Sequence, residues 1–185
     1  MAHDVCPWWL GYFLISPLRR LMQDPRKIVG RYVREGMTVL EPGPGMGFFT
    51  LELGRLVGPS GRVVAIDIQP RMLANLKRRA ARAGLLERLD ARLATPSALG
   101  IEGLAGTVNF TLAFALVHEL PAAEPFFQQV ALASKTGAGL LFVEPAAHVK
   151  PEEFEAELDS AVRTGFRLME RPTIRRSHAA FLKKT

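Results

Sequence analysis

Short apolar runs alternate with amphipathic stretches along most of the chain, and this alternation restricts the fold more than any other feature. The apolar runs are Met37–Leu40, Val63–Ile66, Val108–Leu116 and Leu140–Val143, and Leu89–Leu93 reads as a further strand. Runs that are apolar throughout are typical of strands covered on both faces. Strands separated by helices pair in parallel, so the pattern indicates a parallel α/β sheet.

The amphipathic stretches read as helices. They are one or two short helices within 18–34, then Phe48–Leu56, Arg71–Ala83, Pro121–Ser134 and Pro151–Arg163. Asp24-Pro25 is a helix start or break, and Gly84 caps the helix that ends at Ala83. Two strands, Phe166–Arg171 and Ala179–Lys183, close the chain without a helix between them, which favours an antiparallel hairpin.

We therefore predict a doubly wound, Rossmann-like α/β domain over 35–185. Its mostly parallel sheet ends in a C-terminal antiparallel hairpin and carries helices on both faces. Residues 1–34 form a helical, aromatic extension.

The length and composition exclude several classes of protein. The 185 residues suit one globular domain, and a net charge of +6 is compatible with an anionic partner without requiring one. A single cysteine, Cys6, excludes a disulfide framework and a cysteine-rich metal site, so we expect a reducing, cytoplasmic compartment and no metal. The longest near-apolar run, Val5–Ile15, is shorter than the roughly 20 residues that a spanning helix needs.

A glycine-rich loop follows the first predicted strand and carries the pattern Glu41-x-Gly43-x-Gly45-x-Gly47. Glycines at a strand-to-helix turn let the backbone approach a ligand closely. A nicotinamide site would have the spacing G-x-G-x-x-G, whereas here the third glycine comes one residue earlier. Glu41 would repel a pyrophosphate but could accept hydrogen bonds from a cationic ligand.

This pattern resembles motif I of the class I S-adenosylmethionine-dependent methyltransferases, and the resemblance covers about 28–145. It implies S-adenosylmethionine as cofactor, with Glu41 near its amino-acid end. Asp67 ends the second strand, where the family places an acid on both ribose hydroxyls, and a carboxylate offers two acceptors to a vicinal diol. A dinucleotide fold has an acid at about the same distance, so Asp67 alone does not discriminate.

The resemblance also implies contacts around the adenine. Ile68 would form an apolar wall, and Thr95 or a nearby main-chain group would replace the acid that many members carry after the third strand. Asn109 stands where many have Asp. The predicted cofactor-binding residues are Glu41, Gly43, Gly45, Gly47, Asp67, Ile68, Thr95, Ala113 and Phe114.

The absence of several methyltransferase motifs excludes some classes of methyl acceptor. The chain has no Asn- or Asp-Pro-Pro-Tyr run, no Pro-Cys nucleophile and no convincing Lys-Asp-Lys-Glu set for ribose methylation. With those groups excluded, the sequence resembles the type 11, UbiE-like group of methyltransferases, which mostly methylates small molecules. We expect a small acceptor, and a lipophilic one is among the candidates.

Polar residues after the fourth strand are the predicted catalytic groups. His118 is the candidate base because histidine titrates near neutrality, and Glu119 could orient an acceptor hydroxyl. Glu144 and His148 are further polar groups predicted at the carboxyl ends of the strands. Equally, 118–119 could be a solvated helix start where Glu119 favours the helix dipole.

Two segments leave alternatives open. The aromatic segment Trp8–Leu14 could be a lid, a core or dimer contact, or, with Arg19-Arg20, a shallow membrane anchor. The basic helix around Lys77–Arg79 reads as a solvated face or as a surface for RNA or protein. The alternatives to a small-molecule enzyme are thus an RNA or protein methyltransferase and a non-catalytic cofactor-binding module. We consider nucleic acid the less favoured partner and expect a monomer or homodimer.

Overall fold

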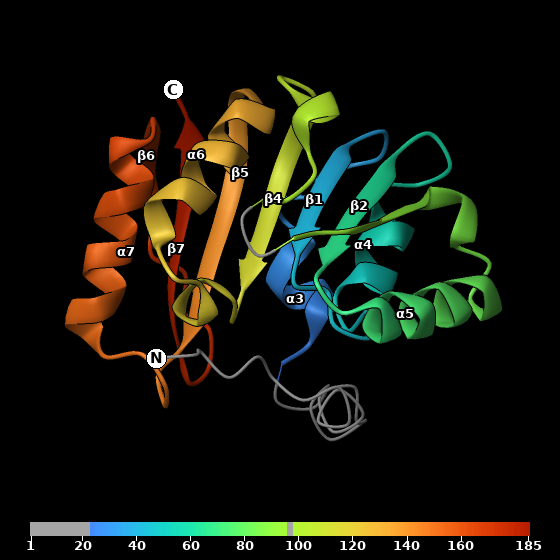
Figure 1. Cartoon of the computed structure of the whole chain (residues 1–185), viewed down its shortest axis with the longest axis horizontal. Helices are drawn as coiled ribbons and strands as arrows, with labels where there is room; N and C mark the ends of the chain where they lie inside the picture. The colour runs from blue at the N-terminus through green and yellow to red at the C-terminus, as the bar shows by residue number, and fades with distance from the viewer. Residues whose placement is uncertain (1–22, 96–97) are drawn as a thin grey trace. The chain divides into compact units, whose positions relative to one another are not determined.

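The computed structural model describes residues 23–95 and 98–185, which fall into two compact units that meet at Gly100 and Ile101 in the sequence. The strand order is β3-β2-β1 within the first unit and β4-β5-β7-β6 within the second (Figure 1). The predicted extension over 1–34 lies largely outside the described residues, and the Trp8–Leu14 segment lies there entirely. Among the residues described, no helix is both long and apolar enough to cross a bilayer.

The first unit alternates helices and strands as the sequence predicts. Its elements are α3 (Pro25–Val29), β1 (Thr38–Pro42), α4 (Thr50–Leu56), β2 (Arg62–Asp67), α5 (Pro70–Arg82), the 3-10 turn η1 (Leu86–Arg88) and β3 (Leu89–Leu93). β1 pairs in parallel with β2, and β2 with β3. The three strands are therefore parallel, as expected for strands joined by helices.

Local sequence explains where the helices of this unit begin and end. The Asp24 side chain accepts a hydrogen bond from the backbone N–H of Arg26 at 3.0 Å, and Pro25 occupies the first turn of α3. α5 buries an apolar stripe against β2 and β3 and stops at Gly84, whose φ of +67° is the left-handed conformation that glycine adopts readily. The predicted start at Asp24-Pro25 and cap at Gly84 are confirmed.

The second unit carries the antiparallel end of the sheet. Its elements are η2 (Glu102–Leu104), β4 (Val108–Phe114), η3 (Val117–Glu119), α6 (Ala123–Ala133), β5 (Ser134–Pro145), α7 (Pro151–Arg163), β6 (Phe166–Glu170) and β7 (Ser177–Lys184). β4 and β5 are parallel, whereas β7 is antiparallel to both β5 and β6. The predicted mostly parallel sheet with a closing hairpin is confirmed.

An aromatic column forms part of the core of this unit. The rings of Phe142 on β5 and Phe154 on α7 stack with centroids 4.8 Å apart. Phe127 on α6 packs edge-on against Phe142 at 5.4 Å, and α6 and α7 lie side by side (Figure 1). This packing fixes α7 against β5, the strand that ends in Glu144.

β5 differs from its predicted extent. We expected a strand over Leu140–Val143, preceded by Gly137 and Gly139, whereas β5 runs from Ser134, directly after α6. The register with β4 shifts near Val108, and Gly137 has a φ of +79°, so the chain bends within the strand. A Cβ on Gly139 would lie 2.8 Å from the Phe181 ring, so this glycine serves close packing across strands.

Candidate functional site

The glycine loop connects β1 to α4 in the first unit. Gly43, Gly45 and Gly47 all have positive φ, at +69°, +54° and +84°. Residues that carry a side chain rarely adopt this backbone conformation, which explains why glycine recurs at every second position. The backbone N–H of Gly43 donates to the Ile66 carbonyl at 2.8 Å and ties the loop to the end of β2.

Helix α5 supports the same loop. A Cβ on Gly47 would overlap with the Leu76 side chain, so the loop backbone packs directly on α5. Arg79, one turn further along, donates a hydrogen bond from its guanidinium to the carbonyl of Met46. Sequence reasoning assigned Arg79 to a solvated basic face and missed this role. Its spacing of three residues from buried Leu76 was the available signal.

Glu41 is the most unusual group at this loop. Its side chain is only 3% exposed, and its Oε2 atom has no hydrogen-bond partner within the described residues. Burial raises the pKa of Glu41 to about 7, although the neighbouring Thr50 hydroxyl lowers it slightly. An ionised carboxylate buried without a partner is costly, and a cationic ligand would remove that cost.

The other predicted cofactor residues of this unit lie near the end of β2 and after β3. Asp67 is half-buried, and its Oδ1 accepts from the backbone N–H of Gln69 at 2.8 Å. Ile68 is exposed, and the hydroxyl of Thr95 accepts from the backbone N–H of Ala98 at 3.1 Å. Thr95 therefore serves a local turn, and its contact with adenine stays a prediction.

These residues fit the cofactor that the sequence resemblance implies. S-adenosylmethionine carries an ammonium group, a vicinal diol and, on its sulfonium, the activated methyl group that it supplies. The unpartnered oxygen of Glu41 suits the ammonium group, and the carboxylate of Asp67 suits the diol. Glu41 pairs in register with Ala65, two residues before Asp67, so both acids lie toward the carboxyl ends of adjacent strands.

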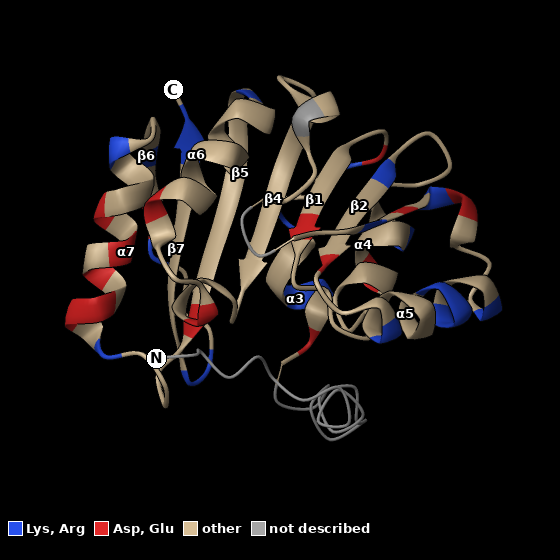
Figure 2. Cartoon of the chain, in the orientation of Figure 1, with Lys and Arg blue, Asp and Glu red and all other residues tan. Residues whose placement is uncertain are grey.

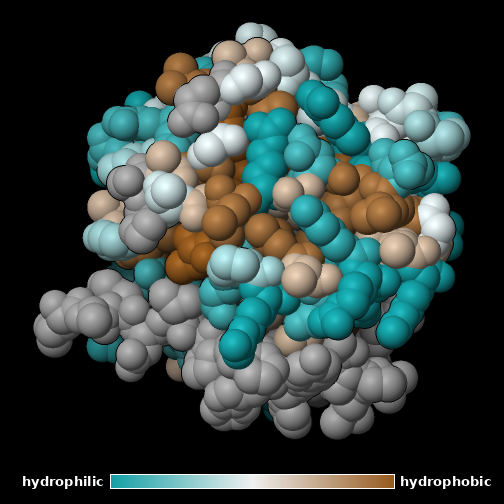
Figure 3. All heavy atoms as spheres, turned by 45° about the vertical axis from the view of Figure 1, so that its right-hand side comes forward, coloured by the Kyte–Doolittle hydropathy of each residue, from teal (hydrophilic) through white to brown (hydrophobic). Residues whose placement is uncertain are grey.

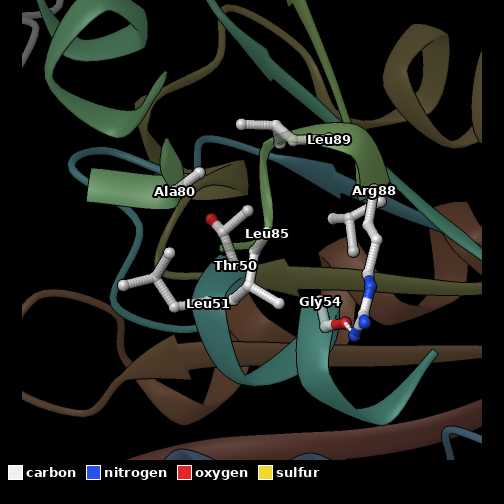
Figure 4. Close-up of a pocket in the computed structure, with 8 residues that line it drawn as sticks. Thr50, Leu51, Gly54, Ala80, Leu85, Arg88 and Leu89 are labelled. Atoms are coloured by element: carbon white, nitrogen blue, oxygen red, sulfur yellow. Dashed lines mark hydrogen bonds between the residues drawn. The ribbon is translucent and has the colours of Figure 1, made fainter. Parts of the chain in front are cut away.

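A separate hollow in this unit does not suit a cofactor. It lies beside α4 and η1, and Arg88 donates across it to the Gly54 carbonyl at 3.1 Å (Figure 4). Its free volume is about 10 Å³, room for little more than one water molecule. Its lining is mostly aliphatic, so we interpret it as a packing defect.

In the second unit, the segment after β4 carries the predicted catalytic residues. Ala113 is buried and Phe114 half-buried at the end of β4, so Ala113 has no side-chain surface for a ligand. His118 and Glu119 lie in η3 and not at the start of α6, which begins at Ala123. They therefore do not start α6, and their predicted catalytic roles stay predictions.

His118 and Glu144 lie within ion-pair distance of each other. Nδ1 of His118 lies 2.5 Å from Oε2 of Glu144, whose side chain is fully buried at the end of β5. The ring of His148 packs edge-on against that of His118, with centroids 5.8 Å apart. Sequence reasoning named all three residues but did not predict the contact between His118 and Glu144.

Burial and charge perturb several of these groups. The contact with Glu144 raises the pKa of His118 above its ordinary value, although partial burial opposes the shift. Burial raises the pKa of Glu119. Burial and the charge of Glu144 raise the pKa of Glu157 on α7 to about 7. Sequence reasoning missed Glu157, which follows buried Phe154 by three residues on the same helix.

The raised pKa of Glu41 makes stability depend on pH. Between about pH 4.5 and 7, the folded state retains a proton that the unfolded state has lost, so stability falls as pH rises. We expect Glu41→Gln to be more stable than wild type at pH 8, on the order of 3 kcal/mol, and nearly equal at pH 4. Urea unfolding of the cofactor-free protein at both pH values measures this difference. Equal stabilities at pH 8 would contradict the buried, unpartnered carboxylate.

Loss of the Asp67 carboxylate should weaken cofactor binding. Hydrogen bonds from two hydroxyls to a charged group contribute about 1.5–3 kcal/mol, or roughly tenfold or more in affinity. Titration calorimetry of Asp67→Ala with S-adenosylhomocysteine measures the loss. Asp90→Ala is the matched control, because Asp90 pairs with Arg92 on β3. Unchanged affinity in Asp67→Ala would remove Asp67 from the site.

Comparison with solved structures places the fold. A S-adenosylmethionine-dependent methyltransferase from Aquifex aeolicus superposes with a TM-score of 0.86 at 23% identity, covering 98% of this chain and 100% of that one. TrmN from Thermus thermophilus superposes with a TM-score of 0.70 at 20% identity, covering 87% of this chain and 48% of that one. At these identities the likeness shows the fold alone.

Comparison of sequences identifies the family of this chain. A tRNA (adenine(57)-N(1)/adenine(58)-N(1))-methyltransferase, TrmI from Methanocaldococcus jannaschii, is 36% identical over 56 residues, which is 30% of this chain and 20% of that protein. The chain thus matches about a fifth of the length of that curated relative. The methyltransferase domain family Methyltransf_31 matches residues 33–175. The chain belongs to this family, with the class I fold and S-adenosylmethionine as cofactor.

Proposed function

We propose that this methyltransferase acts on a small acceptor that carries a dissociable proton, and that His118 is its general base. The observation that carries the proposal is the contact of 2.5 Å between His118 Nδ1 and the fully buried Glu144 carboxylate. The side chain of His118 is 19% exposed, so part of the ring reaches solvent. Histidine held in this way resembles the general bases of other enzymes.

The chemistry requires alignment first and a base second. S-adenosylmethionine, when bound, would supply the activated methyl group, and the residues of the site would have to hold the acceptor against it. Positioning of the reactants supplies several kcal/mol of the rate enhancement. An acceptor that starts with a dissociable proton must also lose it, and the free ring nitrogen of His118 would take that proton.

Two finer expectations remain predictions. Glu119, which is half-buried beside His118 in η3, could orient a hydroxyl of the acceptor. A lipophilic acceptor also stays a prediction, and the aromatic segment Trp8–Leu14, which could stack on one, lies outside the described residues. The structure therefore supports a base more directly than it supports a particular acceptor.

Removal of the base should slow turnover and spare the cofactor. We expect His118→Ala to lower turnover about 10²-fold or more, the usual range for loss of a general base, with nearly unchanged affinity for S-adenosylhomocysteine. An active acceptor is first found by screening phenols, quinols and thiols with labelled cofactor. His178→Ala is the control, because His178 contacts Val149 and Phe154. Full activity in His118→Ala would mean that catalysis needs no base or that Glu144 or His148 supplies it.

An RNA acceptor is the second candidate, and helix α5 favours it. The helix carries five cations and no acid, and four of them, Arg71, Lys77, Arg78 and Arg82, are exposed. Figure 2 shows this run of Lys and Arg on α5, in contrast with the acidic α7. In Figure 3, hydrophilic side chains surround hydrophobic patches on the face brought forward. The local match to TrmI also supports an RNA acceptor.

Charge removal on α5 separates the two candidates. If RNA is the acceptor, the triple variant Lys77→Ala, Arg78→Ala, Arg82→Ala should bind unmodified tRNA more weakly and with a shallower salt dependence than wild type, because fewer phosphates are neutralised. Filter binding at several salt concentrations measures both. The control removes three exposed cations of the other unit, Arg167, Arg175 and Arg176. Equal binding by all three proteins, or none by wild type, would reject an RNA surface on α5.

A further inference from the structure

A strained turn precedes the histidine. Ala115 has a φ of +53°, a conformation that residues with a side chain seldom adopt, and its N–H donates to the Val143 carbonyl at 2.8 Å. The turn directs the chain out of β4 and into η3. Strain of this kind persists where surrounding contacts determine it, and it is concentrated at functional sites.

Glu144 supplies those contacts. Its Oε1 accepts hydrogen bonds from the backbone N–H groups of Leu116 at 3.3 Å and Val117 at 2.7 Å. Its Oε2 faces Nδ1 of His118 at 2.5 Å. The carboxylate is 0% exposed, and both of its oxygens have partners in these two N–H groups and the ring. One buried side chain thus fixes both the backbone of η3 and the ring that η3 carries.

The backbone donors restrict how His118 can be protonated. Because Oε1 already accepts two N–H groups, the carboxylate is held with Oε2 toward the ring. A carboxylate only accepts hydrogen bonds, so Nδ1 must carry the proton in neutral His118. The lone pair is then left on Nε2, the nitrogen that a base would use.

We propose that Glu144 is a positioning residue that holds neutral His118 as the Nδ1–H tautomer, so that Nε2 is the atom that accepts the acceptor's proton. The proposal rests on the proposed role of His118. In the balanced step, the acceptor–methyl bond forms as the carbon–sulfur bond breaks. The acceptor's proton moves to Nε2 and leaves as His118 returns to its neutral form.

Other charged groups also face His118. They are Glu119 on η3, His148 in the turn after β5 and Glu157 on α7. Glu157 acts on His118 only through its charge, whereas Glu144 also contacts the ring. A comparison of the two glutamates therefore separates the effect of charge from the effect of the contact.

The test uses Glu144→Gln with Glu157→Gln as the matched control. Glutamine keeps an oxygen for the two backbone N–H groups and turns its NH2 toward Nδ1, which must then accept. The neutral ring should switch to the Nε2–H tautomer. Long-range 1H–15N correlation spectra of histidine-labelled protein report the tautomer, with His118→Asn identifying the signal. A pH titration of the same spectra gives the pKa of His118.

We expect the Nδ1–H tautomer in wild type and in Glu157→Gln. Glu144→Gln should show Nε2–H, a lower pKa for His118 and turnover lowered about as far as in His118→Ala, roughly 10²-fold. Glu157→Gln should lower the pKa of His118 without changing the tautomer. An Nε2–H tautomer in wild type would overturn the proposal even if Glu144→Gln failed to fold. An unchanged tautomer or undiminished turnover in folded Glu144→Gln would also overturn it.

The spectra do not depend on knowing the acceptor, so the two proposals can fail separately. If His118 has the Nδ1–H tautomer but His118→Ala is fully active, the proposed base is wrong and Glu144 only orders η3. If His118→Ala is inactive but wild type shows Nε2–H, His118 is needed and Glu144 does not position it as proposed.

Discussion

The buried carboxylate of Glu41 is the constraint on which the cofactor site depends. Among the described residues, Glu41 and Glu144 are buried near the ends of strands, and they differ in one respect. Both oxygens of Glu144 have partners, whereas one oxygen of Glu41 has no partner in the described part of the chain. A satisfied buried carboxylate orders its surroundings, and an unsatisfied one costs stability until a ligand binds. The two residues are thus suited to different tasks, Glu144 to positioning and Glu41 to binding.

Helix α5 links the glycine loop to the surface of the first unit. Leu76 and Arg79 contact the loop on one side, and Lys77, Arg78 and Arg82 are exposed on another. Substitutions in one basic run therefore have different consequences. Loss of Arg79 would disturb the loop backbone, whereas loss of its exposed neighbours would alter only the surface charge. Charge-reversal scans of α5 need to treat Arg79 separately for this reason.

The sequence predicted the fold well because the spacing of apolar residues and the residues that start or end helices are local properties. Apolar runs, Asp24-Pro25 and Gly84 each act within a few residues, and their predicted structures were confirmed. The predicted loop glycines likewise all require positive φ. The contacts that sequence missed are distant in the chain: Arg79 with Met46, and His118 with Glu144, 26 residues apart. Gly139 was expected to precede the strand, because nothing local shows the Phe181 ring that packs against it within β5.

Proton release on cofactor binding tests the central claim most directly. Glu41 with a pKa of about 7 is mostly protonated at pH 6.5, and binding of an ammonium group should ionise it. Calorimetric titration with S-adenosylhomocysteine in buffers of different ionisation enthalpy should show release of about 0.8 proton per ligand bound. Glu41→Gln should release none. Equal proton release in both proteins, or none in wild type, would contradict the assignment of Glu41 to the cationic end of the cofactor.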